Sequence, residues 1–111
     1  MTTTMMTQQN QTNSTFEGIA KEMVELHERK NHDYGNAFGQ TYQEFAEISQ
    51  VMANGYALGS LKNKVNRLLT LMSGAEAKVE NESIEDSLID LASYAIMTLE
   101  EMRKTKNNGT E

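Results

Sequence analysis

The sequence predicts an all-α fold, and three observations support this prediction. The 111-residue chain contains no proline and has few runs of β-branched residues. No segment alternates apolar and polar residues between regularly spaced turns, as the strands of a sandwich or barrel would. Apolar residues instead recur every three or four positions, the spacing that places side chains on one face of an α-helix. We therefore expect a four-helix bundle-like domain.

The first helix is expected to begin at Ser14, after residues 1–13, an uncharged low-complexity segment that predicts a disordered tail. Ser14 and Glu17 have the spacing of a capping box, in which each side chain bonds a backbone N–H at the helix start. The expected apolar stripe consists of Phe16, Ile19, Ala20, Met23 and either Leu26 or His27. A loop is expected over residues 30–36, because their Asn, Asp and Gly favour turns.

Two further helices are expected in the middle of the chain. Thr41 and Glu44 form a second capping-box match, and Asn54-Gly55 has the chemistry of a helix end. The apolar face of this second helix contains Tyr42, Phe45, Ala46, Ser49 and Met52. The third helix is expected from about Ser60 to Met72, with Ser73-Gly74 as its end. Its core stripe is Leu61, Val65, Leu68, Leu69 and Met72.

The fourth helix is expected from about Glu82 to Arg103, after a polar linker that ends at about Asn81. The domain then spans residues 14–104, and residues 105–111 are expected to fray. At about 100° per residue, one wide face is apolar. It contains Ile84, Leu88, Leu91, Ala92, Ala95, Leu99 and Met102, while the remaining sector carries Asp86, Asp90, Ser93, Tyr94 and Met97. We expect the chain's own bundle or a second subunit to surround this helix. Because its apolar face is so wide, we expect a homo-oligomer, either a dimer or a tetramer.

Composition excludes several functional classes. The chain has 10 Lys+Arg against 16 Asp+Glu and a formal net charge of −6, which argues against binding to duplex nucleic acid. It has no cysteine, and therefore no disulfide, zinc finger, iron–sulfur cluster or thiol nucleophile. No apolar stretch is long enough to span a bilayer and no signal peptide is recognisable, so we expect a cytoplasmic protein without a membrane partner.

Two pairs of carboxylates indicate a metal site. Asp86 and Asp90 lie one helical turn apart, and their mutual repulsion must be offset by water, a proton or a divalent cation. Glu44 and Glu47 repeat the motif on the second helix. Two helices that each present such a pair predict an all-oxygen site for Mg²⁺ or Mn²⁺. In the alternative reading, Glu44 serves its capping box, Glu47 is a surface residue, and Asp86 interacts with the helix dipole.

Cations and one aromatic loop are candidates for nucleotide binding. Lys62, Lys64 and Arg67 lie on the basic third helix and suit phosphate groups, although a solvated face would have the same composition. In the loop over residues 30–36, the ring of Tyr34 offers a stacking surface and Asp33 a hydrogen-bond acceptor, with Lys30 beside them.

Three segments carry a resemblance to a known family. Residues 30–36 (KNHDYGN), 61–68 (LKNKVNRL) and 82–97 (ESIEDSLIDLASYAIM) together resemble the nucleotide modification associated domain, a small family frequent in bacteriophages. That family is similar to the all-α NTP pyrophosphatases of the MazG and dUTPase-like type. The resemblance covers about residues 16–103.

The resemblance implies an α-helical oligomer in which a Glu-x-x-Glu helix and a Glu-x-x-Asp helix bind Mg²⁺. Such enzymes split a nucleoside triphosphate into a monophosphate and pyrophosphate. Glu44 and Glu47 match the first pair and Asp90 matches the closing Asp. Ser87 stands where the family pattern has its other Glu, so Asp86 would replace that ligand from a shifted position.

The leading hypothesis is a Mg²⁺-dependent pyrophosphohydrolase that acts on a (deoxy)nucleoside triphosphate. The metal ligands would be Glu44, Glu47, Asp86 and Asp90, with Glu47 and Asp90 as catalytic residues. The nucleotide would contact Lys30, Asp33, Tyr34, Lys62, Lys64, Arg67 and Tyr94. One alternative is a phage protein that sequesters a nucleotide or a nucleotide-derived immune signal without turnover, in the host cytoplasm. Another is a structural helical oligomer whose carboxylates are surface charges.

Overall fold

A computed structural model describes residues 14–34, 36–74 and 83–109. Among these residues every regular element is an α-helix and there is no strand, which confirms the predicted all-α class. The chain divides into two compact units, residues 1–35 and 36–111, each of which is described by itself. No helix in the described ranges combines the length and the apolar character needed to cross a bilayer. The predicted tail over residues 1–13 and most of the predicted linker lie outside the described residues.

The first unit contains helix α2, Phe16–Tyr34. Its start is capped by Thr15 instead of the predicted Ser14, because the Thr15 hydroxyl accepts a hydrogen bond of 3.0 Å from the Gly18 N–H. The helix continues through the predicted loop up to Tyr34. The residues of this segment are weak helix formers but not helix breakers, so the backbone ladder continues through them.

In the second unit, α3 spans Ala37–Ile48 and α4 spans Gln50–Met72. The N-cap of α3 is Asn36, whose side chain accepts from the Gly39 N–H at 3.1 Å, so this helix begins before the predicted Thr41. Ser49 has extended backbone angles and ends α3. Its hydroxyl accepts from the Met52 N–H at 3.0 Å and thereby caps α4. One serine therefore separates the two helices.

The predicted break at Asn54-Gly55 is wrong, because both residues lie inside α4. Ala53 and Ala57 on either side of the pair are buried in the core. Glycine costs about 1 kcal/mol in a helix interior relative to alanine, an amount that such packing offsets. The end predicted for the third expected helix is confirmed, because Ser73 is the C-cap of α4 and Gly74 follows with a φ of +90°.

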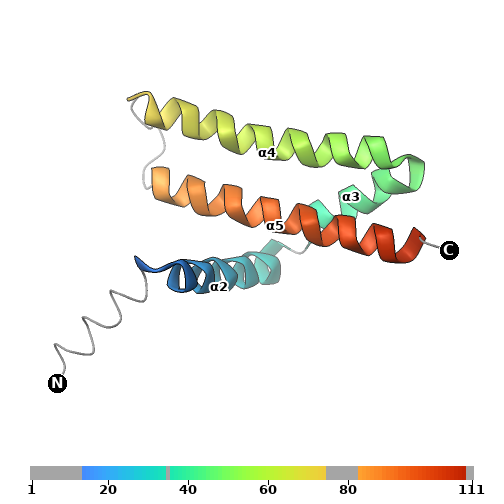
Figure 1. Ribbon diagram of the computed structural model, residues 1–111, viewed down its shortest axis with the longest axis horizontal. Coiled ribbons are helices and arrows are strands. Elements are labelled where there is room, and N and C mark those ends of the chain that lie inside the picture. Colours follow the sequence, from blue (N-terminus) through green and yellow to red (C-terminus); the bar gives the residue numbers. More distant parts are fainter. Residues whose placement is uncertain (1–13, 35, 75–82, 110–111) are drawn as a thin grey trace, which may run out of the picture. The chain divides into compact units, whose positions relative to one another are not determined.

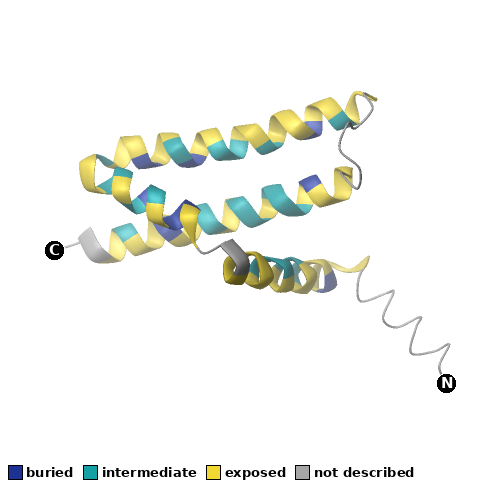
Figure 2. Ribbon diagram, turned by 180° about the vertical axis from the view of Figure 1, so that it is seen from behind, coloured by how far each residue is buried: buried dark blue, intermediate teal, exposed yellow. Residues whose placement is uncertain are grey.

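Helix α5 spans Ile84–Gly109 and continues past the predicted end at Arg103. At its start the Ser83 hydroxyl accepts from the Asp86 N–H at 3.0 Å. Helices α4 and α5 run antiparallel side by side, and α3 packs against both (Figure 1). Buried and half-buried positions lie where these helices face one another (Figure 2).

The core of the second unit is aromatic. Phe38 and Tyr42 of α3 are buried together with Ala53 and Ala57 of α4. The ring of Phe38 lies 5.4 Å from that of Tyr56 and, edge to face, 5.4 Å from that of Tyr94 in α5. Such ring pairs contribute about 0.5–1.5 kcal/mol beyond their buried area. The Phe38 ring of α3 therefore contacts one aromatic residue of α4 and one of α5.

Candidate functional site

A cavity of about 300 Å³ lies between α4 and α5. Two facing groups of side chains line it, Asn63, Lys64 and Arg67 from α4, and Ser87 and Asp90 from α5. The α4 residues are spaced one, three and four positions apart, and the α5 residues three apart, so each group lies on one side of its helix. The antiparallel packing of the two helices brings the groups together (Figure 1).

An ion pair holds the side chains of Lys64 and Asp90 in the cavity. The Lys64 Nζ lies 2.8 Å from the Asp90 Oδ2, and both side chains are about one-quarter to one-third exposed, at 30% and 25%. The same Nζ lies 4.5 Å from the centre of the Tyr94 ring, within the range of a cation–π contact. The carboxylate and the ring therefore fix the position of the ammonium group.

The other lining groups supply hydrogen-bond donors. Arg67 offers the planar fork of its guanidinium, Asn63 an amide and Ser87 a hydroxyl. Ser87 is buried, with 7% of its surface exposed, so little water competes for its hydroxyl. With two cations and one carboxylate, the lining has a net positive formal charge. An anion with several oxygens matches this set of groups.

The structure brings together part of the predicted nucleotide-binding set. Lys64 and Arg67 line the cavity, and Tyr94 lies beneath Lys64. Lys62 points elsewhere, since its side chain is exposed and its Nζ lies 3.4 Å from the Asn66 Oδ1. Lys30 belongs to α2 in the other unit. The side chains of Asp33 and Tyr34 lie outside what the structure describes.

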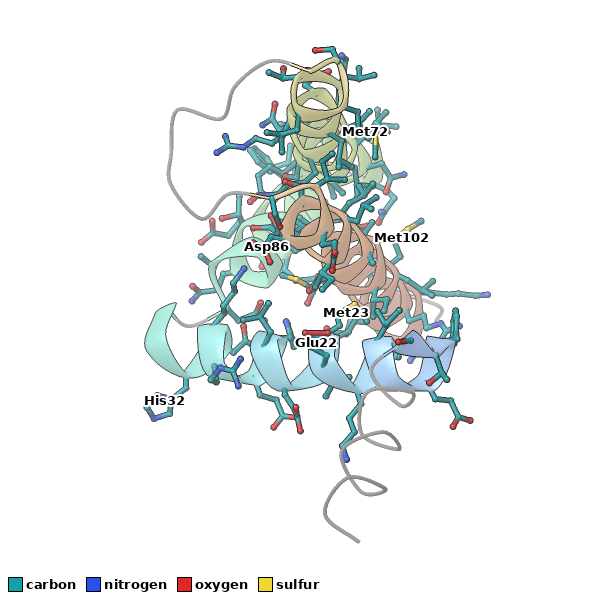
Figure 3. The ribbon with its side chains drawn as sticks, turned by 90° about the vertical axis from the view of Figure 1, so that its left-hand side faces the viewer. Glu22, Met23, His32, Met72, Asp86 and Met102 are labelled. Atoms are coloured by element: carbon teal, nitrogen blue, oxygen red, sulfur yellow. The ribbon has the colours of Figure 1, made fainter. Side chains whose placement is uncertain are left out.

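The four predicted metal ligands are not brought together in the second unit. Asp90 lines the cavity, whereas Asp86 is exposed in the first turn of α5 (Figure 3). Glu44 and Glu47 are exposed on α3 and do not line the cavity. Within the described ranges no three or more His, Asp or Glu side chains form a group that could hold a metal ion. Asp90 is paired with the Lys64 ammonium group.

Sequence reasoning missed two lining residues, Asn63 and Ser87. A signal for each is present in the sequence. Asn63 precedes Arg67 by one helical turn, and Ser87 precedes Asp90 by three residues. Ser87 is also the residue that stands where the Glu-x-x-Asp pattern expected from the resemblance has its Glu. The cavity therefore has a hydroxyl group at this position and not a second carboxylate.

Comparisons with known proteins support the family and no more. The model of the family described as nucleotide modification associated domain 1 matches residues 30–102, which is more than half of the chain and includes every residue that lines the cavity. Neither the search of curated proteins nor that of solved structures found a match. The chain belongs to the nucleotide modification associated domain 1 family.

Proposed function

We propose that the cavity between α4 and α5 binds the phosphate groups of a nucleotide. The observation that carries this proposal is the convergence of Lys64, Arg67 and the buried Ser87 on one cavity of about 300 Å³. Ligand pockets for whole drug-sized molecules range from about 300 to 1,000 Å³. The volume therefore suits a di- or triphosphate better than a complete nucleotide, whose base would extend from the mouth of the cavity. The family description also points to nucleotides.

Binding would exchange one ion pair for another. In the free protein the Lys64 Nζ is paired with the Asp90 Oδ2 at 2.8 Å. A phosphate that enters the cavity competes with Asp90 for the ammonium group, and Arg67 is a second cation on the lining. Because Tyr94 lies beneath the Lys64 ammonium, the lysine needs little reordering to reach the ligand. The protein would thus bind phosphate through its own cations, without requiring a metal.

Variants of two cations on the same helix test this proposal. Binding of nucleoside triphosphates, cyclic dinucleotides and pyrophosphate would be measured by calorimetry in EDTA. Arg67→Gln should weaken binding of the best ligand by roughly tenfold or more, since a hydrogen bond to a charged group contributes about 1.5–3 kcal/mol. Lys62→Gln is the matched control and should leave the affinity unchanged, because Lys62 does not line the cavity. Equal losses in both variants, or no binding by the unmodified protein, would contradict the proposal.

Metal-dependent hydrolysis is the second candidate function. The observation in its favour is that a carboxylate, Asp90, lines the same cavity as the two cations. The Mg²⁺ or Mn²⁺ requirement predicted from the sequence belongs to this candidate. Chromatography of the reaction mixture distinguishes it from binding alone, since conversion of a triphosphate to monophosphate and pyrophosphate would appear with Mg²⁺ and disappear in EDTA. Asp90→Asn should abolish that conversion, and turnover that persists in this variant would exclude the assignment.

We also propose that the protein acts as a homo-oligomer. Exposed apolar side chains on α4 and α5 support this proposal, among them Leu58, Leu69 and Leu99. Large apolar surfaces that are exposed to solvent are typical of interaction sites. Sedimentation of the full chain over a range of concentrations would measure the state of association.

A further inference from the structure

One side of α5 is apolar and exposed along most of the helix. We define the α5 seam as Leu88, Ala92, Ala95, Leu99 and Met102, which follow one another at intervals of four and three residues. This is the spacing of positions that pack against a partner helix in a coiled coil. All five residues are exposed, and the three large ones remain more than two-fifths accessible, at 44%, 47% and 43%.

The α5 seam is centred on Ala95, although its two halves are not identical. Leu88 and Met102 lie seven residues before and after Ala95, whereas Ala92 lies three residues before it and Leu99 four residues after it. About a two-fold axis at Ala95, the small Ala92 of one copy would lie near the large Leu99 of the other. A two-fold axis beside Ala95 would place Leu88 of one copy against Met102 of the other, twice, and would let the helices approach closely at the alanines.

The charges along α5 distinguish an antiparallel from a parallel pair. From Ile84 to Leu99 the helix has acidic residues and no Lys or Arg, whereas from Met102 to Gly109 it has basic residues and no Asp or Glu. Glu85 lies ten residues before Ala95, and Lys106 lies eleven residues after it. An antiparallel pair brings these opposite charges together at both ends, while a parallel pair would place like charges side by side.

Helix α4 extends the same surface. Val51, Leu58, Val65 and Met72 follow one another at intervals of seven residues and are all exposed. The segment over residues 50–61 of this helix contains no charged residue. Figure 3 shows Met72 and Met102 on one side of the α4–α5 pair and Asp86 on the other. The apolar surface thus covers two adjacent helices.

From these observations we propose that two copies of this chain pack α5 against α5 in antiparallel fashion about an axis beside Ala95, with α4 of each copy flanking the pair. This proposal rests on the homo-oligomer proposed above and specifies its interface. A second copy fits because the α5 seam complements itself, with small side chains near large ones and acidic residues near basic ones. The α4 and α5 helices of two copies then form the core that the second unit by itself leaves open.

Single-cysteine variants test the register directly, since the chain has no cysteine of its own. In Ala95→Cys the two introduced thiols should face each other at the axis, and mild oxidation should convert most of the protein to a disulfide-linked dimer. Glu100→Cys is the matched control, because Glu100 is exposed on the same helix but away from the α5 seam. It should remain largely monomeric on a denaturing gel. Thermal melts would establish that both variants fold.

A charge exchange tests the antiparallel orientation. Glu85→Lys should weaken dimerisation several-fold in sedimentation, and a second substitution, Lys106→Glu, should restore much of the loss. A chain that stays monomeric at high micromolar concentration overturns the proposal and leaves the surface to another occupant. If Ala95→Cys dimerises but its introduced thiols form no disulfide, the register alone is overturned. Nucleotide affinity is measured in a separate titration. A dimer that forms as expected but binds no nucleotide would refute the phosphate site and not this interface.

Discussion

The two sides of α5 differ in where their polar residues lie. The side that faces α3 and α4 carries the polar residues Ser87, Asp90 and Glu101 beside Tyr94 and Met97, which pack against the aromatic core. The α5 seam on the other side is apolar and exposed. A helix of an isolated monomer usually exposes a polar side. The comparison teaches that the polar groups inside the unit belong to the cavity and its supporting bonds, and that the α5 seam requires a cover from outside the unit.

The polar groups on the inner side are well bonded. Glu101 is buried, with 2% of its surface exposed, and its carboxylate accepts from the Gln43 amide at 2.9 Å and from the Lys104 ammonium at 3.0 Å. The Tyr42 hydroxyl donates to the Asn54 side chain and accepts from Gln50. In the described part of the chain no buried side-chain nitrogen or oxygen lacks a hydrogen-bond partner. These polar groups make the packing of the inner side specific, because only a correct placement of α3 satisfies their hydrogen bonds.

The largest expected effect contrasts a buried ring with a residue of the α5 seam. Phe38→Ala removes a ring that is 6% exposed and contacts Tyr94, and it should lower the free energy of unfolding by about 3–5 kcal/mol. Leu99→Ala, on the exposed side, should cost less than about 1 kcal/mol in dilute protein. Urea unfolding at two protein concentrations measures both. If the α5 seam is an interface, the free energy of unfolding lost in Leu99→Ala should rise with protein concentration. Equal losses for the two variants in dilute protein would refute the contrast between the buried ring and the α5 seam.

Sequence periodicity is sufficient for the fold class and for several residues of the candidate site. Residue type and helical position single out Lys64, Arg67, Asp90 and Tyr94, and the structure brings these side chains together, while their roles stay predictions. The pairing of Lys64 with Asp90 was not recognised, because it depends on how far α4 is shifted along α5. Helical spacing within one helix contains no information about that shift. The metal role of Glu44 and Glu47 stays a prediction.

Helix boundaries failed where side chains outside the local sequence decide them. Ser49 breaks the chain between α3 and α4 because its hydroxyl caps the second helix, while Asn54-Gly55, with stronger turn chemistry, remains helical. Asn54 is bonded to Tyr42 on α3, a contact that no local pattern contains. The wide apolar side of α5 was correctly located on the helix. The exposure of this side was not predictable, because amphipathicity does not tell whether the chain's own helices or a second subunit cover an apolar face.

The second prediction tests the close approach of α3 and α5. A Cβ atom added at Gly39 would lie 2.6 Å from the Glu101 Oε2 and 2.5 Å from the Asn36 Nδ2. Gly39→Ala should therefore displace the buried carboxylate and the helix cap, at a cost of about 1–3 kcal/mol. Gly59→Ala is the control, since nothing lies within 4 Å of its added Cβ, and it should stabilise α4 by about 0.5–1 kcal/mol. Thermal unfolding measures both, and a neutral Gly39→Ala would show that α3 packs less closely.

The third prediction separates the contribution of the cavity to binding from its contribution to stability. Ser87→Ala removes one buried hydroxyl from the lining and should weaken the best phosphate ligand by roughly fivefold, the equivalent of about 1 kcal/mol. The free energy of unfolding should change by less than that amount, because no large group is removed. Calorimetric titration and urea unfolding of the same preparation provide the comparison. A loss of stability without a loss of affinity would assign Ser87 to packing alone.

The smallest expected effect concerns pH and the cation that supports the inner side of α5. The hydrogen bond and the charge of Glu101 raise the pKa of Lys104 above its ordinary value. Because the folded-state pKa lies above that of the unfolded chain, the stabilisation is fully present below about pH 10.4 and is lost as the pH rises through the folded-state value. The Lys104 side chain is 48% exposed, so solvent screening limits the effect to a few tenths of a kcal/mol.

The difference in stability between the unmodified protein and Lys104→Met should therefore be constant from pH 8 to 10 and shrink above that range. The corresponding difference for Lys62→Met, which lacks a carboxylate partner of this kind among the described contacts, should not follow this course. If the Lys104→Met difference instead grew with pH, the pair with Glu101 would not be what holds this lysine.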